Sequence, residues 1–146
     1  MRNQTRPMEI LLVEDEEGDI ILTRMAFEES PYKVNLSVAR DGELAMDFLH
    51  RKLPYQDSPR PDLILLDINM PKKDGLEVLE EVKSDPDLGC IPIAILTTSE
   101  AEEDILRAYH QHANCYIRKP IEIDRFSEMV REIEVFWLET VILPPR

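Results

Sequence analysis

The stretch Leu63-Ile64-Leu65-Leu66-Asp67 is the most apolar run of the chain, and it ends on a carboxylate. Four consecutive aliphatic residues without alternating polar ones predict a short strand buried on both faces, as at the centre of a parallel sheet. Other short apolar runs with polar residues close behind them are Ile10–Val13 before Glu14 and Asp15, Ile93–Leu96 before Thr97, and Tyr116–Ile117 before Lys119. Because the carboxyl ends of parallel strands meet at one edge of a sheet, we expect these polar side chains to gather there.

Helical patterns separate the expected strands. Apolar residues recur at helical spacing around residues 21–26, 44–49, 76–82 and 105–109, and Val34, Leu36 and Val38 alternate as in a strand nearer the sheet edge. A last long helix is predicted from about Ile123 to Glu139, and its expected inward residues are Phe126, Met129, Val130, Ile133 and Trp137. Strands that alternate with helices form right-handed βαβ units, so we predict an α/β fold with a doubly wound (βα)5 arrangement.

Composition and charge limit the classes of function. The 146 residues are 43% apolar and 32% charged, which fits one domain, and no apolar run approaches the roughly 20 residues of a membrane span. The net charge of −13 argues against a nucleic-acid partner, and the polar N-terminus is not a secretory signal, so we expect a cytoplasmic location. We expect residues 1–146 to form a single domain, with a flexible N-terminus at 1–8 and a tail at 141–146.

The tail contains the apolar run Val141-Ile142-Leu143. An exposed apolar tail favours contact with a partner, whereas the alternative is that it folds back onto the last helix. Both interpretations stay open on the sequence alone.

The polar residues at the strand ends fit phosphoryl transfer to a carboxylate. Asp67 would be ionised at neutral pH, and Glu14 and Asp15 could help to hold Mg²⁺, which prefers oxygen ligands. Lys119 and Thr97 could contact phosphoryl oxygens. Each of these residues alone is more typical of a solvated surface, a turn or a helix cap. Their joint occurrence at the ends of successive strands of one βα series favours the functional interpretation.

These motifs resemble the receiver domain of bacterial two-component response regulators over roughly Glu9 to Leu138. The matching segments are Leu-Val-Glu14-Asp15, Leu-Leu-Asp67-Ile-Asn-Met-Pro71, Asp74-Gly75, Leu-Thr97-Thr98-Ser99 and Lys119-Pro120. The resemblance implies a flavodoxin-like fold with a five-stranded parallel sheet in the order 2-1-3-4-5. It implies that Asp67 is the phosphoacceptor, contacted through its phosphoryl group by Thr97 and Lys119. Mg²⁺ would be held by Glu14, Asp15, Asp67 and the backbone carbonyl of Asn69, and Tyr116 would change rotamer with Thr97.

A narrower resemblance concerns the partner. The segments Asn-Cys115-Tyr116 and Glu134 to Val141, with the proline-containing loop at Tyr55 to Pro61, are similar to the small response regulators paired with cyanobacterial-type phytochromes. Those proteins are stand-alone receivers, and some dimerise through the face between the fourth and fifth helices. The implied partner is a histidine kinase, with a phytochrome as one candidate and other kinases as alternatives. The sequence does not separate an adaptor from a phosphorelay intermediate.

Two rival functions use similar residues. A phosphatase of the haloacid dehalogenase class also uses a strand-end Asp with Mg²⁺, but it needs a second acid two residues later, where this chain has Asn69. A docking module that never takes phosphate is the other rival, although no member of the expected site is missing. We therefore expect a signalling protein that catalyses its own phosphorylation and dephosphorylation, not an enzyme with a separate substrate.

Overall fold

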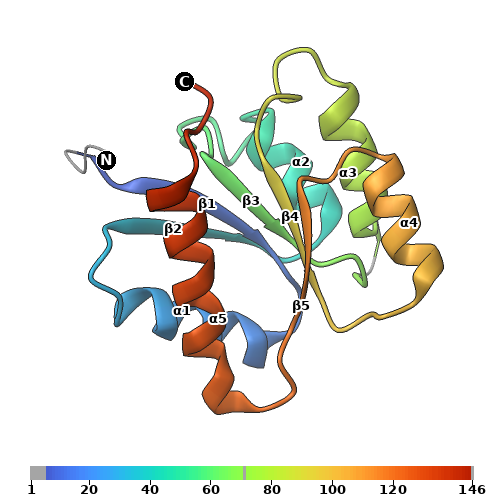
Figure 1. The fold of residues 1–146 in the computed structure, drawn as a ribbon. Helices are drawn as coiled ribbons and strands as arrows, with labels where there is room; N and C mark the ends of the chain where they lie inside the picture. Colours follow the sequence, from blue (N-terminus) through green and yellow to red (C-terminus); the bar gives the residue numbers. More distant parts are fainter. Residues whose placement is uncertain (1–5, 71, 146) are drawn as a thin grey trace.

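The computed structural model describes residues 6–70 and 72–145, which form a five-stranded parallel sheet with helices on both faces (Figure 1). The strands are β1 (Met8–Val13), β2 (Val34–Ala39), β3 (Leu63–Leu66), β4 (Ile93–Thr97) and β5 (Cys115–Arg118). The helices are α1 (Glu17–Glu28), α2 (Gly42–Leu49), α3 (Gly75–Ser84), α4 (Glu102–His110) and α5 (Phe126–Glu134), with the short segments η1 (Ile123–Arg125) and η2 (Val135–Thr140) on either side of α5. The order β2-β1-β3-β4-β5 confirms the doubly wound (βα)5 fold predicted from the sequence.

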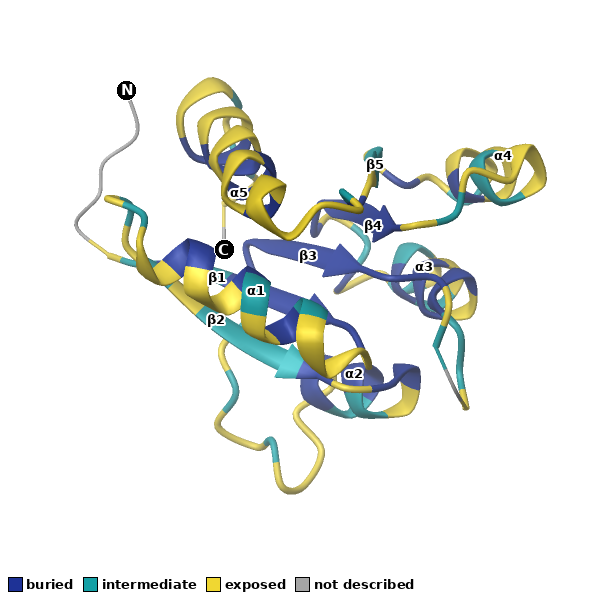
Figure 2. Cartoon of the chain, turned by 90° about the horizontal axis from the view of Figure 1, so that it is seen from below, coloured by how far each residue is buried: buried dark blue, intermediate teal, exposed yellow. Residues whose placement is uncertain are grey.

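The sheet separates two hydrophobic cores. Helices α1 and α5 pack against each other over one face, and α2, α3 and α4 cover the other (Figures 1 and 2). Strand β3 contributes to both cores, because Leu63 and Leu65 face α1 and α5 while Ile64 and Leu66 face the opposite layer. Its side chains are fully buried, as expected for the central strand of a parallel sheet.

Side-chain caps fix where α2 and α3 begin, beyond the ends of β2 and β3. Asp41 accepts from the Leu44 N–H at 2.8 Å at the start of α2. Asp74 and Glu77 form a reciprocal capping box at the start of α3, with bonds of 3.0 and 3.2 Å. Such bonds satisfy backbone donors that a first helical turn leaves unpaired. The loops that lead from the sheet edge into these helices are therefore held in place.

The last helix differs from the single helix expected over Ile123–Glu139. It comprises the 3-10 turn η1, the α-helix α5 and the wider π-type turn η2. The widening is seen in a backbone bond that spans five residues, from the Val141 N–H to the Phe136 carbonyl at 3.0 Å. The inward residues are nevertheless those predicted, and these are Phe126, Met129, Val130, Ile133 and Trp137.

The structure also describes part of the N-terminus and most of the C-terminal tail. Strand β1 begins at Met8, which is buried, whereas residues 1–5 and 146 lie outside the described part. In the tail, Val141 and Leu143 pack against the α1 and α5 core, while the side chain of Ile142 is 98% exposed. The fold-back interpretation of the tail thus holds for two of its three apolar residues. None of the helices in residues 6–70 and 72–145 is long and apolar enough to cross a membrane.

Candidate functional site

Backbone bonds at the carboxyl edge of the sheet align the first polar residues beyond the strands. The Asp67 N–H donates to the Val13 carbonyl at 3.0 Å, which continues the pairing of β3 with β1 by one residue. The Lys119 N–H donates to the Thr97 carbonyl at 2.8 Å, and this bond continues the pairing of β5 with β4. The sheet register therefore brings these side chains to the same edge, as the sequence predicted.

Three carboxylates form a cluster at this edge. Glu14, Asp15 and Asp67 each offer an oxygen, and these oxygens lie within 4.8 Å of one another. Glu14 and Asp67 are buried, whereas Asp15 is exposed to solvent. Carboxylate oxygens at this spacing are the donor set that a hard divalent cation prefers, and a cation would offset their mutual repulsion. The cluster therefore fits a divalent metal ion.

The Lys119 ammonium lies inside this group of carboxylates. Its Nζ forms an ion pair with Glu14, lies 2.8 Å from Asp19 Oδ2 and lies 3.5 Å from Asp67 Oδ2. The Lys119 side chain is 5% exposed, so the ammonium exchanges most of its water contacts for these carboxylates. A buried charge requires this kind of compensation.

The pKa values at the edge reflect this crowding. Burial raises the pKa of Glu14 to about 7, although its contact with Lys119 acts in the opposite direction. Burial by itself lowers the pKa of the Lys119 ammonium, but its bonds to Asp19 and Glu14 and the charge of Asp67 outweigh that effect and raise it. Lys119 therefore stays charged throughout the physiological pH range.

The loop that follows β4 connects Thr97 with Tyr116. Thr97 is fully buried, and its Oγ1 accepts from the Ser99 N–H at 3.3 Å. The Tyr116 hydroxyl donates to the Ser99 carbonyl at 3.0 Å, and its ring packs against the core under α3 and α4. The Ser99 hydroxyl bonds to Asp104 in the first turn of α4 at 2.7 Å. Contacts thus run without a gap from Thr97 to α4 and to Tyr116.

The loop after β3 holds the remaining predicted residue. The Asn69 N–H donates to Asp67 Oδ1 at 3.2 Å, which leaves Oδ2 on the side of Lys119. Pro71, which belongs to the same predicted motif, lies outside the described residues.

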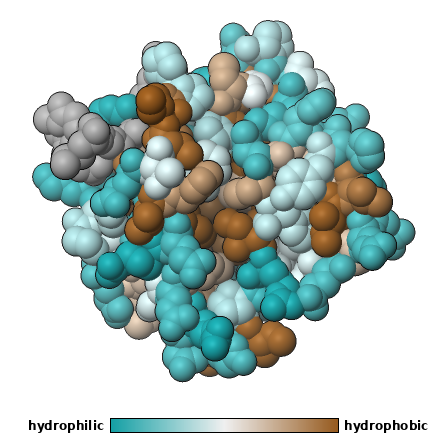
Figure 3. Space-filling view, viewed as in Figure 1, coloured by the Kyte–Doolittle hydropathy of each residue, from teal (hydrophilic) through white to brown (hydrophobic). Residues whose placement is uncertain are grey.

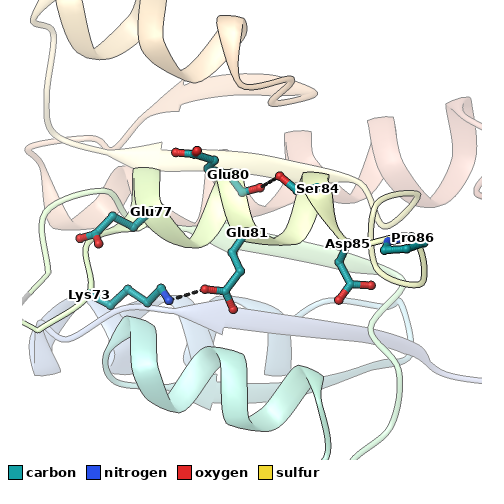
Figure 4. A pocket seen from close by; sticks show the side chains of 7 residues that line it. All are labelled: Lys73, Glu77, Glu80, Glu81, Ser84, Asp85 and Pro86. Carbon is teal, nitrogen blue, oxygen red and sulfur yellow. Dashed lines mark hydrogen bonds and ion pairs between the residues drawn. The ribbon is translucent and has the colours of Figure 1, made fainter.

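A separate surface hollow of about 600 Å³ lies along α3 and is not part of this group (Figure 4). Its wall includes the ion pair of Lys73 with Glu81 and the bond from the Ser84 hydroxyl to the Glu80 carbonyl. The hollow is open and acidic, and it contains none of the residues predicted at the strand ends. The candidate site is therefore the cluster at the sheet edge.

A comparison with protein families shows which family the chain belongs to. Residues 10–131 match the model of the response regulator receiver domain. The chain belongs to this receiver family. Membership places it among two-component signalling receivers instead of the haloacid dehalogenase class of phosphatases.

Individual relatives show which members of the family this chain is similar to. The receiver is 49% identical to the response regulator Rcp1 of Synechocystis sp. over 138 residues, which cover 94% of each chain. It superposes on the crystal structure of the phosphorylated cyanobacterial phytochrome response regulator RcpA with a TM-score of 0.92 and 46% identity, covering 96% of this chain and all of RcpA. The Mn²⁺-bound form of Rcp1 matches with a TM-score of 0.90 and 49% identity, over 95% of this chain and all of Rcp1. The resemblance to phytochrome response regulators is thereby confirmed.

Asp19 is the residue of the receiver site that was not predicted. It contacts Lys119 across 100 residues of sequence. Asp19 lies in the first turn of α1, four residues after Asp15, and that turn starts at the edge where the strands end. The sequence carried no spacing signal for this contact, because Asp15 precedes the helix and the contact depends on how α1 faces the end of β5.

Proposed function

We propose that this receiver is a response regulator that accepts a phosphoryl group on Asp67 from the phosphohistidine of a sensor histidine kinase. The observation that carries the proposal is the position of Asp67. Its carboxylate directly follows the central strand, belongs to the three-carboxylate cluster and has Oδ2 3.5 Å from the Lys119 ammonium. A nucleophilic oxygen, a cation-binding cluster and a fixed positive charge are the parts that phosphoryl transfer needs.

The transfer step follows from this placement. An oxygen of Asp67 attacks phosphorus in line while the bond from phosphorus to the imidazole nitrogen breaks. The electron pair of that bond returns to the nitrogen, and the imidazole leaves as a neutral ring if its other nitrogen carries a proton. Lys119 stabilises the charge on the phosphoryl oxygens, and the Thr97 hydroxyl donates to one of them. The product is an aspartyl phosphate on Asp67.

The proposed cation is Mg²⁺. Glu14, Asp15 and Asp67 would hold it with the backbone carbonyl of Asn69, and it would neutralise negative charge on the donor and on the acceptor. The carboxylate cluster supports this assignment, as does the crystal structure of a relative, Rcp1, with Mn²⁺ bound. The choice of Mg²⁺ over other divalent ions is part of the proposal.

Phosphorylation would change the surface formed by α4, β5 and α5. When Thr97 turns toward the phosphoryl group, the Ser99 loop follows, and the bond from the Tyr116 hydroxyl to Ser99 is altered. Apolar side chains gather among polar ones on this surface (Figure 3). The exposed apolar residues in α4, and in the segments that flank β5 and α5, are Leu106, Tyr109, Ile121, Ile123, Val135 and Phe136. We assign this surface to partner binding or to a homodimer.

The proposed kinase is a phytochrome or a related sensor. The likeness to RcpA and Rcp1 supports this choice, since RcpA is a phytochrome response regulator. A cytoplasmic location and the absence of nucleic-acid and membrane partners stay predictions from the sequence.

The test is the intact mass of the protein after incubation with acetyl phosphate, with and without Mg²⁺. We expect a gain of one phosphoryl group that requires Mg²⁺ and is lost in Asp67→Asn. Asp87→Asn, a matched change of an exposed residue after α3, should gain the group as the parent does. A gain in Asp67→Asn would exclude Asp67 as the acceptor. If neither acetyl phosphate nor a phosphorylated kinase labels the parent, the protein is a docking module instead.

A further inference from the structure

The Lys119 ammonium lies closer to Asp19 than to the proposed acceptor. Its Nζ is 2.8 Å from Asp19 Oδ2 but 3.5 Å from Asp67 Oδ2. The Asp19 side chain is 26% exposed, whereas that of Lys119 is 5% exposed. Asp19 therefore holds a buried ammonium from the solvent side of the site.

The start of α1 gives Asp19 a fixed position. Glu16 caps the helix by accepting from the Gly18 N–H at 3.2 Å, and its carbonyl accepts from the Ile20 N–H at 3.0 Å. Ile20, the residue that follows Asp19, is buried in the core between α1 and α5. With a cap on one side and a buried side chain on the other, the backbone at Asp19 has little freedom to move.

We propose that Asp19 is a positioning residue. It keeps the Lys119 ammonium near the Asp67 carboxylate, at 3.5 Å, and prevents it from forming a closer ion pair with Asp67. The inference rests on the proposed function of Asp67 as phosphoacceptor. Glu14 is part of the carboxylate cluster that fits the cation, and Asp19 is outside that cluster. Asp19 is thus the carboxylate that can remain with Lys119 while the others serve the cation.

This position matters for the acceptor oxygen. An ammonium in direct contact with Asp67 would cover Oδ2 and withdraw charge from the nucleophile. By holding Nζ at a distance, Asp19 leaves Oδ2 accessible to phosphorus and keeps a donor of Lys119 free for a phosphoryl oxygen. Without Asp19, the carboxylate nearest to the ammonium after Glu14 is that of Asp67. The ammonium should then move into direct contact with Asp67.

A simple charge effect predicts the opposite result, and this makes the inference testable. Removing one negative charge near the site should speed the approach of an anionic phosphodonor. Removing a positioning contact should slow phosphorylation, because small displacements of a group at the reaction site reduce the rate strongly. The sign of the rate change therefore separates the two explanations.

The experiment measures the rate of Asp67 phosphorylation by acetyl phosphate at saturating Mg²⁺ and constant pH in Asp19→Asn, Asp19→Ala and Glu17→Gln. Glu17 is the matched control, since it lies in the same first turn but is exposed and pairs with Arg40. We expect Asp19→Ala to slow the reaction about tenfold. Asp19→Asn should slow it less, because its amide oxygen can still accept from Lys119, and Glu17→Gln should match or slightly exceed the parent. Rates at or above that of Glu17→Gln in both Asp19 variants would overturn the inference.

A second readout follows Lys119 without any phosphoryl transfer. The ammonium signal of Lys119 in ¹⁵N-edited NMR spectra, assigned with Lys119→Arg, should shift and exchange faster with water in Asp19→Ala but not in Glu17→Gln. An unchanged signal in Asp19→Ala would also overturn the inference. If the parent accepts no phosphoryl group, the proposed function fails, and this signal still decides whether Asp19 positions Lys119.

Discussion

The first residue of α3, Gly75, lies directly against the backbone of Asp67. A Cβ atom at Gly75 would be 2.2 Å from the Asp67 carbonyl oxygen and 2.5 Å from the Ile68 Cα, both of which are backbone atoms that cannot turn aside. The Gly75 N–H also donates to the Ile68 carbonyl at 3.1 Å, which closes the loop between β3 and α3. Glycine at this position therefore sets the location of the proposed acceptor.

Gly75→Ala should destabilise the protein and reduce phosphorylation together. The added methyl group must displace the backbone at Asp67, and we expect a loss of about 2–3 kcal/mol in the free energy of unfolding, as for other overpacked sites. Urea unfolding and the phosphorylation rate are the measurements. Gly18→Ala is the control, because its Cβ would meet Glu16 at an ordinary 3.4 Å. A loss of similar size in Gly18→Ala would show that the close approach at Gly75 is not the cause.

Lys119→Met should destabilise the metal-free protein at neutral pH. The change leaves the carboxylates around Lys119 without their buried counter-charge, and breaking a buried ion pair in this way costs on the order of 3 kcal/mol. Mg²⁺ should restore part of the lost stability. Lys73→Met removes the more exposed ion pair with Glu81 and should cost less than about 1 kcal/mol. The measurement is urea unfolding of both variants. If Lys119→Met and Lys73→Met lost the same free energy of unfolding, Lys119 would not be the buried counter-charge of the carboxylates.

Asp15→Asn should separate cation binding from folding. Asp15 is the exposed member of the carboxylate cluster, so its replacement should change the metal-free unfolding free energy by less than about 0.5 kcal/mol. In the parent, Mg²⁺ at a hundred times its Kd should add about 2.7 kcal/mol by binding the native state. Most of that gain should vanish in Asp15→Asn but not in Asp87→Asn. Thermal unfolding with and without Mg²⁺ provides the comparison, and an unaltered Mg²⁺ response would remove Asp15 from the cation site.

Glu134 should make stability depend on pH. Its carboxyl is fully buried on α5, with Oε2 accepting from the Ser30 hydroxyl and Oε1 without a hydrogen-bond partner among the described residues. Burial raises its pKa above the ordinary value, although Ser30 and Arg131 act in the opposite direction. The folded protein thus keeps the Glu134 proton at pH values where the unfolded chain has lost it. The stability gained from this proton is complete below the unfolded pKa and is lost as pH rises to the folded pKa.

Glu134→Gln removes this titration while nearly keeping the shape of the side chain. The free energy of unfolding of Glu134→Gln relative to the parent should therefore be greater at pH 8 than at pH 4.5. Urea unfolding at the two pH values measures it, and the comparison between pH values cancels any constant effect of the amide. Glu132→Gln, on the exposed side of the same helix, should show no such difference. A difference that does not grow with pH would mean that the pKa of Glu134 is not raised in the folded protein.

Most of the fold could be predicted because it depends on local patterns. The apolar run at Leu63–Leu66 and the alternation at Val34–Val38 correspond to a central and an edge strand, as expected. The gathering of Glu14, Asp67 and Lys119 followed from strand ends alone, since parallel strands leave little choice of where their last residues lie.

Other features depend on how elements face each other, which a linear pattern does not contain. The contact of Asp19 with Lys119 requires the orientation of the first turn of α1 relative to the end of β5. The π-type turn at Val135–Thr140 buries the same inward face as a regular helix would, so the spacing of apolar residues does not distinguish the two. The direction of the tail after Val141 likewise depends on the core that it meets.

The sharing of β3 between the two cores has a consequence for where motion can occur. Asp67 directly follows β3, which cannot shift without opening packed layers on both sides. Tyr116 lies in β5 and Lys119 directly follows it, and β5 is an outer strand whose side chains are half-buried or exposed. The two sides of the site should therefore differ in rigidity: Asp67 lies on the more rigid side, and Lys119 and Tyr116 lie on the more mobile side. Any rearrangement that begins at Asp67 would be absorbed by β5 and α4 and would leave the acceptor in place.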